Sequence, residues 1–210
     1  MSIGRTARDI YDDPRIGEPV YRVAEFLPPQ GRWTEREFFW LNDDEGLIEL
    51  AAGRLRFLPS PTLTHQRALG FLFRLICESV DDRKLGTTYP LGYRVEVGEN
   101  TFREPDILSI HSRNSTRVGE NYAETADLVV EVVSDSDPDH DWITKKAEYA
   151  AAGIPEYWIA DPRDSTLTIF TLDASATEYR EAGRYKEGDT ANSVLLDGLT
   201  VEVAKVFAAE

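Results

Sequence analysis

The sequence predicts an α/β domain in which a mixed sheet carries helices on both faces. Residues 127–133 are so continuously apolar that a strand there must be covered on both sides. Residues 62–82 form the longest amphipathic helix, because apolar side chains recur at helical spacing at Leu69, Leu72, Phe73, Ile76 and Val80. A second helix is expected over residues 137–153. The apolar strand therefore lies at the centre of the sheet, with helices above and below it.

The chain is expected to form one domain preceded by an arm. Its 210 residues, of which 41% are hydrophobic, are ordinary for a single globular domain, which we place over residues 31–210. Residues 1–30 carry many charges and four prolines without periodicity. This pattern is typical of an extended N-terminal arm that lies over the domain or on a neighbouring subunit.

A short helix and a hairpin are expected before the long helix. Thr34 and Glu37 have capping-box spacing, so a helix starts there and runs to about Leu41. Residues 46–50 and 54–58 alternate in the manner of paired strands, and Glu49 falls within the first of them.

The remaining elements alternate between strands and turns. Asp137 and Pro138 favour a helix start, and Gly153 followed by Pro155 favours its end. Further strands are expected over residues 93–97, 105–110, 155–161, 166–171 and 177–185, with a short amphipathic segment over 201–207.

Charge and hydropathy limit the class of protein. The formal net charge of -15 argues against a protein that coats nucleic acid through its bulk charge, although exposed charges are screened beyond about 8 Å. The sequence has no long apolar stretch, and its first ten residues lack the apolar run of a signal peptide. We therefore expect a cytoplasmic protein with no membrane partner. The single cysteine, Cys77, lies among apolar residues and is expected in the core.

Two acids inside apolar strands are the strongest functional signal. Asp106 and Glu131 have apolar residues as neighbours on their own strand faces, and burying a carboxylate is costly unless a cation meets it. If the two strands are adjacent, both carboxylates converge on one edge of the sheet. There they could hold one Mg²⁺, for which Mn²⁺ would substitute, through carboxylate oxygens and waters.

A lysine on the second helix completes the set. Lys145 shares a helix stripe with Asp141 and Tyr149, one turn before it and one turn after it. A lysine beside a metal-held phosphate can stabilise developing negative charge or orient the attacking water. Two acids, a metal ion and this lysine would suffice to hydrolyse a phosphodiester.

Each of these residues also has a purely structural interpretation. Asp106 could bond to a turn, and Glu131 could pair with a buried arginine or a tyrosine hydroxyl. Lys145 could be the solvated helical partner of Asp141, and Glu49 could lie on a surface hairpin. His65, at the start of the long helix, is expected to be a structural or supporting residue rather than a metal ligand. The aromatic residues Tyr157 and Trp158 are expected in the core rather than on a surface that stacks against bases.

Several blocks of the sequence together form a recognisable series. In order, they are Ile48-Glu49-Leu50 with Gly53-Arg54-Leu55, Pro59-Ser60-Pro61 with His65, Pro105-Asp106, residues 127–134, Asp141 with Lys145 and Tyr149, residues 153–162, and Leu196-Asp197-Gly198-Leu199. This series, which covers roughly residues 34–207, resembles one known family, the Uma-type restriction endonucleases of the PD-(D/E)XK nuclease superfamily.

The resemblance implies a restriction-endonuclease-like core and a role for each candidate residue. Asp106 and Glu131 would be the metal-binding acids, Lys145 the catalytic lysine, and Glu49 an additional acid at the same centre. The parent pattern of the superfamily places its lysine two residues after the second acid, where this chain has Val133. The resemblance therefore depends on a lysine that has moved to the helix.

The expected function is that of a Mg²⁺-dependent endonuclease acting on DNA. Because cutting both strands of a duplex takes two active sites, a homodimer is expected. Two alternatives remain open: a catalytically inactive homo-oligomeric binding or regulatory module of the same fold, which the acidic charge favours, and a hydrolase of small phosphoesters.

Overall fold

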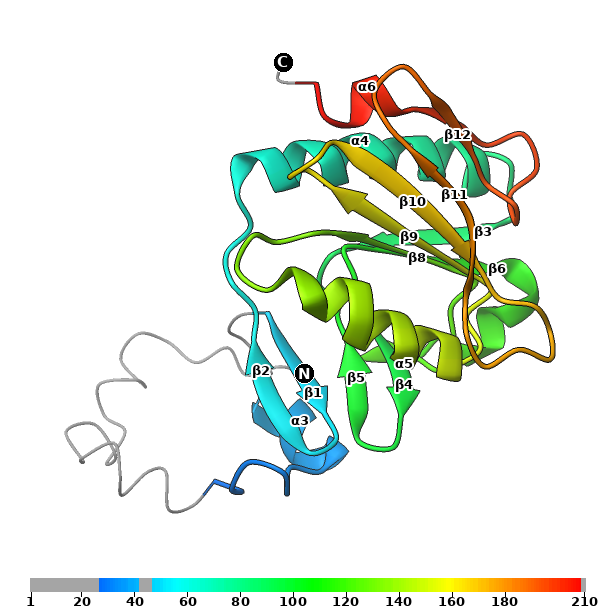
Figure 1. Cartoon of the computed structure of the whole chain (residues 1–210). Coiled ribbons are helices and arrows are strands. Elements are labelled where there is room, and N and C mark those ends of the chain that lie inside the picture. Colours follow the sequence, from blue (N-terminus) through cyan, green and yellow to red (C-terminus); the bar gives the residue numbers. More distant parts are fainter. Residues whose placement is uncertain (1–26, 42–46, 209–210) are drawn as a thin grey trace, which may run out of the picture.

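The computed structural model describes residues 27–41 and 47–208 (Figure 1). Nearly all of the predicted N-terminal arm lies outside the described residues. The described chain contains a six-stranded sheet, a five-stranded sheet and a two-stranded ribbon. No helix among the described residues is both long enough and apolar enough to cross a membrane.

The six-stranded sheet is mixed, as predicted. Its strands follow the order β11-β10-β9-β8-β6-β3. Strands β8 and β9 run parallel to each other, whereas the pairs β6–β8 and β9–β10 are antiparallel. The strand bounds are β3 Gly86–Pro90, β6 Ile107–His111, β8 Leu128–Val132, β9 Glu156–Asp161, β10 Thr166–Thr171 and β11 Arg180–Tyr185.

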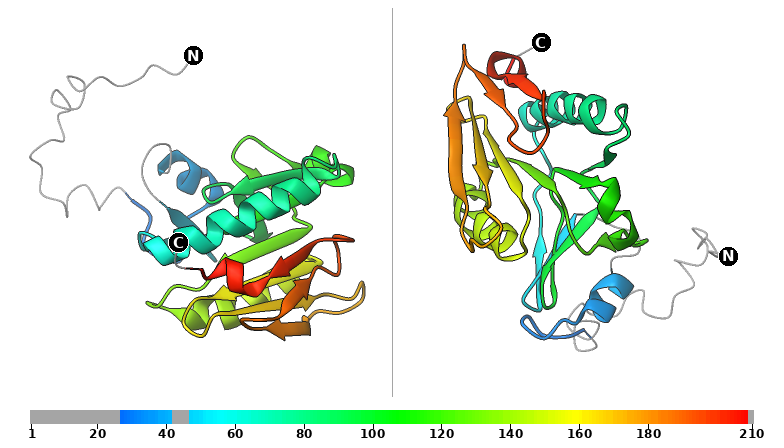
Figure 2. Two further views of the ribbon diagram at one scale, coloured as in Figure 1. Left: turned by 90° about the horizontal axis from the view of Figure 1, so that it is seen from above. Right: turned by 90° about the vertical axis from the view of Figure 1, so that its right-hand side faces the viewer.

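Helices cover both faces of this sheet, and β8 lies between two other strands. The long helix α4 (Leu63–Val80) crosses one face, where it packs on β8 and β9 residues such as Val130 and Trp158 (Figure 2). The opposite face packs against a helix made of two parts, η2 (His140–Lys145) and α5 (Lys146–Ala151). All five side chains of β8 are buried, because the strand is covered on both sides.

The second sheet, ordered β2-β1-β5-β4-β7, lies below the first in Figure 1. Its bounds are β1 Ile48–Ala51, β2 Arg54–Phe57, β4 Arg94–Gly98, β5 Thr101–Arg103 and β7 Tyr122–Ala123. The predicted hairpin is β1–β2, and its turn uses Ala52 and Gly53 at φ 47° and 75°. At Gly53 a Cβ would approach the backbone of Gly31 to 3.0 Å, so glycine is required there.

Short elements complete the fold. Helix α3 (Glu35–Leu41) begins with the predicted capping box, in which the Thr34 amide donates to Glu37 Oε2 at 2.9 Å. The 3₁₀ helix η1 spans Ser112–Arg117, β12 (Thr190–Asn192) pairs with β13 (Thr200–Glu202), and α6 spans Val203–Val206.

Two expectations need correction. The predicted second helix is not uniformly α-helical, since η2 is a π-helical segment that buries both Asp141 and Lys145. Such wide turns are frequent at functional sites. Cys77 is only partly buried, because it falls at the margin of the apolar face of α4. Tyr157 and Trp158 are fully buried, which confirms the expectation that they belong to the core.

Candidate active site

Asp106 immediately precedes β6, and Glu131 lies in the neighbouring strand β8. The β6–β8 register pairs Ile107 with Val130, the residues next to Asp106 and Glu131 in sequence. Asp106 Oδ2 accepts a hydrogen bond from the Val132 amide at 2.7 Å, and Oδ1 lies 2.9 Å from Nε2 of His65. The sheet and the start of α4 therefore fix the Asp106 carboxylate from two sides.

Lys145 is the cation at the centre of the site. Its Nζ lies 2.9 Å from Glu131 Oε1, 3.4 Å from Glu49 Oε1 and 3.5 Å from Asp141 Oδ1. The side chain is only 5% exposed, so the interpretation of a solvated helical pair is wrong. Burial by itself lowers the pKa of Lys145, but Glu131, Glu49 and Asp141 together raise it well above its ordinary value. The ammonium is therefore held in its charged form.

Two side chains of the helical segment η2–α5, Lys145 and Tyr149, hold the Glu131 carboxylate. Tyr149 donates its hydroxyl to Glu131 Oε1 at 2.6 Å, beside the contact with Lys145. Burial raises the pKa of Glu131 well above its usual value. Lys145 opposes this rise, whereas the nearby carboxylates of Asp141 and Asp106 add to it. The carboxylates around Glu131 thus carry more negative charge than the single positive charge of Lys145 can neutralise.

Glu49 lies behind Lys145 and is fully buried, so the surface-hairpin interpretation is wrong for it. Arg103 Nη1 donates to Glu49 Oε2 at 2.7 Å, the Glu104 amide donates to Oε1 at 3.2 Å, and His140 Nε2 lies 3.5 Å from Oε2. Burial raises the pKa of this carboxyl, but Lys145, the His140 hydrogen bond and Arg103 together bring it below its ordinary value. Glu49 is therefore a permanent anion that holds Lys145 in place.

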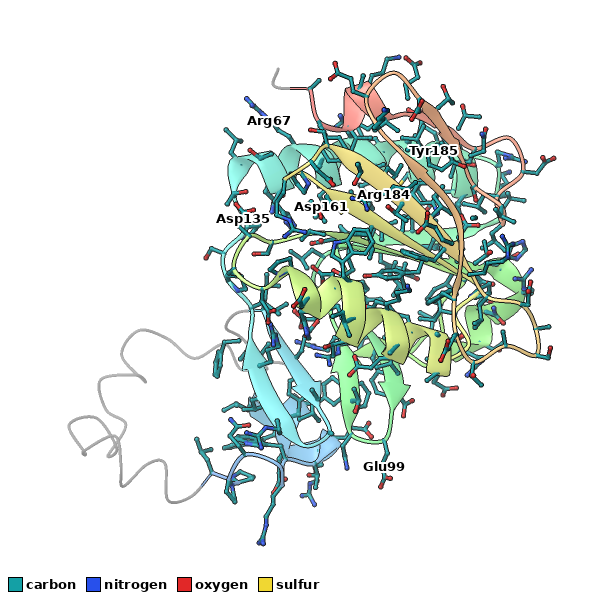
Figure 3. All side chains as sticks on the ribbon, in the orientation of Figure 1. Arg67, Glu99, Asp135, Asp161, Arg184 and Tyr185 are labelled. Atoms are coloured by element: carbon teal, nitrogen blue, oxygen red, sulfur yellow. The ribbon has the colours of Figure 1, made fainter. Side chains whose placement is uncertain are left out.

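A pocket of about 410 Å³ opens over the acids. The charged side chains at its base are Glu104, Asp106, Glu131, Asp141 and Lys145. His65 lines one wall and His140 another, whereas Glu49 is not among the lining residues. On the rim, Arg56 pairs with Asp137 at 2.8 Å and Arg163 pairs with Asp161 at 2.6 Å. Figure 3 labels Asp135, which also lines the pocket, and Asp161, the partner of Arg163.

Several ionisable residues of this region were missed by the sequence analysis. Arg103 bridges Glu49 to Glu148, and His140 contacts Glu49. Glu104 pairs with Arg94, whose Nη2 lies 2.6 Å from Glu104 Oε1. The arginines gave no signal, since their partners are distant in sequence.

Comparisons with known proteins identify the family and the fold of the chain. The Uma2 family, described as a putative restriction endonuclease family, matches residues 22–204. The chain belongs to the Uma2 family. A search of curated proteins finds no match for the chain.

The fold of this Uma2 chain also occurs in a solved structure. The crystal structure of a putative nuclease belonging to DUF820 from Anabaena variabilis superimposes with a TM-score of 0.68 at 16% sequence identity. The alignment covers 86% of this chain and 98% of that chain. This likeness confirms the predicted fold class, and family membership supports nuclease activity in general.

The donor atoms of the Uma2 site fit a hard divalent cation. Within residues 27–41 and 47–208, no three or more His, Cys, Asp or Glu side chains are arranged to hold a metal ion by themselves. Mg²⁺ does not require such a cage, because it binds through one or two carboxylates and keeps several waters. In favour of a cation, the acids at the base crowd together, and Glu104 Oε2 is buried without a hydrogen-bond partner among the described residues.

Glu104 is expected to make the metal-free protein less stable as the pH rises. Burial raises its pKa to about 7, against the opposing effect of Arg94. Because the folded carboxyl binds its proton more tightly than the unfolded one, the stability it contributes is present below about pH 4.5 and is lost as the pH rises through 7.

The measurement is urea unfolding in EDTA from pH 5 to 8. Relative to Glu104→Gln, the wild type should lose on the order of 3 kcal/mol across this range. An equal pH dependence in both proteins would contradict the assignment.

Proposed function

We propose that this Uma2 chain is a divalent-cation-dependent endonuclease that hydrolyses phosphodiester bonds of DNA. The observation that carries the proposal is the convergence of Asp106, Glu131 and Lys145 in one pocket, from two strands and a helix. Mg²⁺ is the proposed cation and Mn²⁺ its substitute. Asp106 and Glu131 would hold it, and when bound it would neutralise phosphate charge and make its water more acidic.

Lys145 would act on the phosphate that undergoes attack. Its ammonium stays charged because three carboxylates surround it, and it lines the pocket from the helix side. In that position Nζ can donate to a phosphate oxygen and stabilise the negative charge that develops there. Water then forms the new P–O bond, and the bond from phosphorus to the leaving oxygen breaks.

The surrounding side chains would keep the reacting groups in place. His65 and the Val132 amide fix Asp106, while Tyr149 fixes Glu131. Asp141 and Glu49 contact Lys145 from either side. These contacts restrict the rotamers of the acids and the lysine, which favours a preorganised site.

We also propose that the enzyme works as a homodimer, since two sites are needed to cut both strands of a duplex. Light scattering of the purified protein tests this point. A monomer at micromolar concentration would contradict it.

One specific feature favours a second candidate function, the hydrolysis of small phosphoesters. The pocket is small, and both arginines that line it are already paired with acids. Tight binding of a duplex usually requires several free cations along the phosphate backbone. Hydrolysis of bis(4-nitrophenyl) phosphate without any cleavage of DNA would support this alternative.

Asp106→Asn is expected to abolish nicking of supercoiled plasmid in Mg²⁺. Because altering even the partners of metal ligands costs roughly 10–100-fold, loss of the ligand itself should cost at least about 100-fold. The exposed residue Asp173 offers a matched control, and Asp173→Asn should cleave like the wild type. EDTA should abolish cleavage by the wild type. Equal cleavage by wild type and Asp106→Asn would contradict the proposal.

A further inference from the structure

The edge of the second sheet carries two arginines beside the active-site pocket. Strand β2, drawn in cyan in Figure 1, is the outermost strand of that sheet. Its register pairs Arg56 with Glu49 and Arg54 with Ala51, and directly opposed partners on paired strands lie on the same face. Because Glu49 contacts Lys145 from that face, both arginines lie on the face of the hairpin that is turned toward the active site.

A second cavity, of about 460 Å³, lies between this hairpin and the helical segment η2–α5. Arg54 and Arg56 line it from the hairpin, and Thr144 lines it from η2. Arg56, Asp137 and His140 line both this cavity and the active-site pocket, so the two lie next to each other. A DNA strand with its scissile phosphate over the acids can therefore extend into the second cavity.

Two of the three arginines in the second cavity are accessible to a phosphate. Arg103 is not, because it is only 1% exposed and is held in two ion pairs. The side chain of Arg56 is 38% exposed and that of its partner Asp137 is 50% exposed, and such exposed pairs are weak. Arg54 is exposed and has no ion pair within residues 27–41 and 47–208. Asp139, an acid of the cavity outside these pairs, is exposed to solvent, which screens its charge.

We infer that Arg54 and Arg56 form a subsite for the backbone phosphates of DNA that flank the scissile bond. This inference rests on the proposed function, and it makes a polynucleotide rather than a small phosphoester the substrate. A guanidinium suits the role because its fork of N–H donors matches two phosphate oxygens. In the free protein Asp137 occupies Arg56, and a phosphate of the substrate takes its place.

The test is fluorescence anisotropy of a labelled DNA duplex in Ca²⁺ over a series of KCl concentrations. The double variant Arg54→Gln/Arg56→Gln should bind roughly tenfold more weakly. The slope of log affinity against log salt should fall by about 1 for each arginine, because each phosphate contact releases counterions. The double variant Arg54→Lys/Arg56→Lys should keep most of the slope, since it keeps both charges.

Arg184→Gln is the matched control. Arg184, labelled in Figure 3, also forms an exposed ion pair, with Asp164, and it is not among the residues that line either cavity. Because the change in charge is the same, Arg184→Gln should bind DNA with the affinity and the salt slope of the wild type.

Asp137→Asn tests the exchange of partners at Arg56. Freed from its acid, Arg56 should bind DNA more tightly, by roughly threefold, and this gain should disappear when Arg56→Gln is combined with Asp137→Asn. If the pair served only to hold the hairpin against the helix, both single variants would lose affinity instead.

The outcomes separate this inference from the proposed function. If the double Gln variant binds with the affinity and salt slope of the wild type while the wild type nicks plasmid, the inference is overturned and the proposed function stands. If the wild type neither binds DNA nor nicks it, both fail. Should the double Gln variant not fold, Asp137→Asn decides, and an affinity equal to or below that of the wild type overturns the inference.

Discussion

Lys145→Met is expected to lose both catalysis and stability. Cleavage should fall roughly 10²–10³-fold, the usual cost of removing one group that stabilises transition-state charge. Glu131, Asp141 and Glu49 all contact this ammonium, and removing one partner of a buried ion pair typically costs about 3–5 kcal/mol.

The loss of stability should grow with pH. Without the ammonium, the pKa values of Glu131 and Asp141, already raised by burial, rise further, so the folded state gains protons relative to the unfolded one. Stability therefore falls as the pH rises from 5 to 8, as urea unfolding can show. Lys146→Met is the matched control, since Lys146 lies over the Phe170 ring at 4.2 Å and not in the pocket lining. It should retain activity, and an equally inactive control would contradict the role given to Lys145.

Glu131→Gln is expected to separate catalysis from stability. The variant loses a proposed metal ligand and the nearest partner of Lys145, so plasmid cleavage should fall at least about 1000-fold. The free energy of unfolding at pH 8 should stay within about 1 kcal/mol of that of the wild type. The neutral amide removes the repulsion between residue 131 and the neighbouring carboxylates, and it can still accept the hydrogen bond from the Tyr149 hydroxyl. A stability loss as large as that of Lys145→Met would show that Glu131 is chiefly a structural ion-pair residue.

The contrast between these two variants follows from counting charges. Three carboxylates lie within 3.5 Å of a single lysine, so the lysine is indispensable for folding, whereas Glu131, whose pKa the neighbouring acids raise, can be replaced by a neutral residue. Enzyme sites are commonly less stable than they could be, because function requires such uncompensated charge.

The parts of the fold that the sequence predicted are those governed by local patterns. Strand β8 was recognised from an apolar run that only Glu131 interrupts, α4 from its periodicity and α3 from its capping box. The sequence left the adjacency of the Asp106 and Glu131 strands as a condition, and the pairing of β6 with β8 meets it.

The rest depended on contacts between distant segments. The second sheet forms because β5 pairs with both β1 and β4, which no short sequence pattern encodes. The π-helical turn at η2, in which Asp141 and Lys145 are buried, was not predicted from the sequence. Arg103 and Glu104 contact Glu49, which lies more than 50 positions earlier in the chain. Sequence spacing could therefore identify the acids and the lysine, but not the charges that hold them.

The most direct test of the account is single-turnover cleavage by Asp106→Asn, Glu131→Gln, Lys145→Met and the triple variant. If the three side chains act as one site on one phosphate, each single change should be nearly as damaging as all three together, since groups that act as a unit are strongly non-additive. Single variants that keep most of the wild-type rate, or losses that simply multiply in the triple variant, would contradict it.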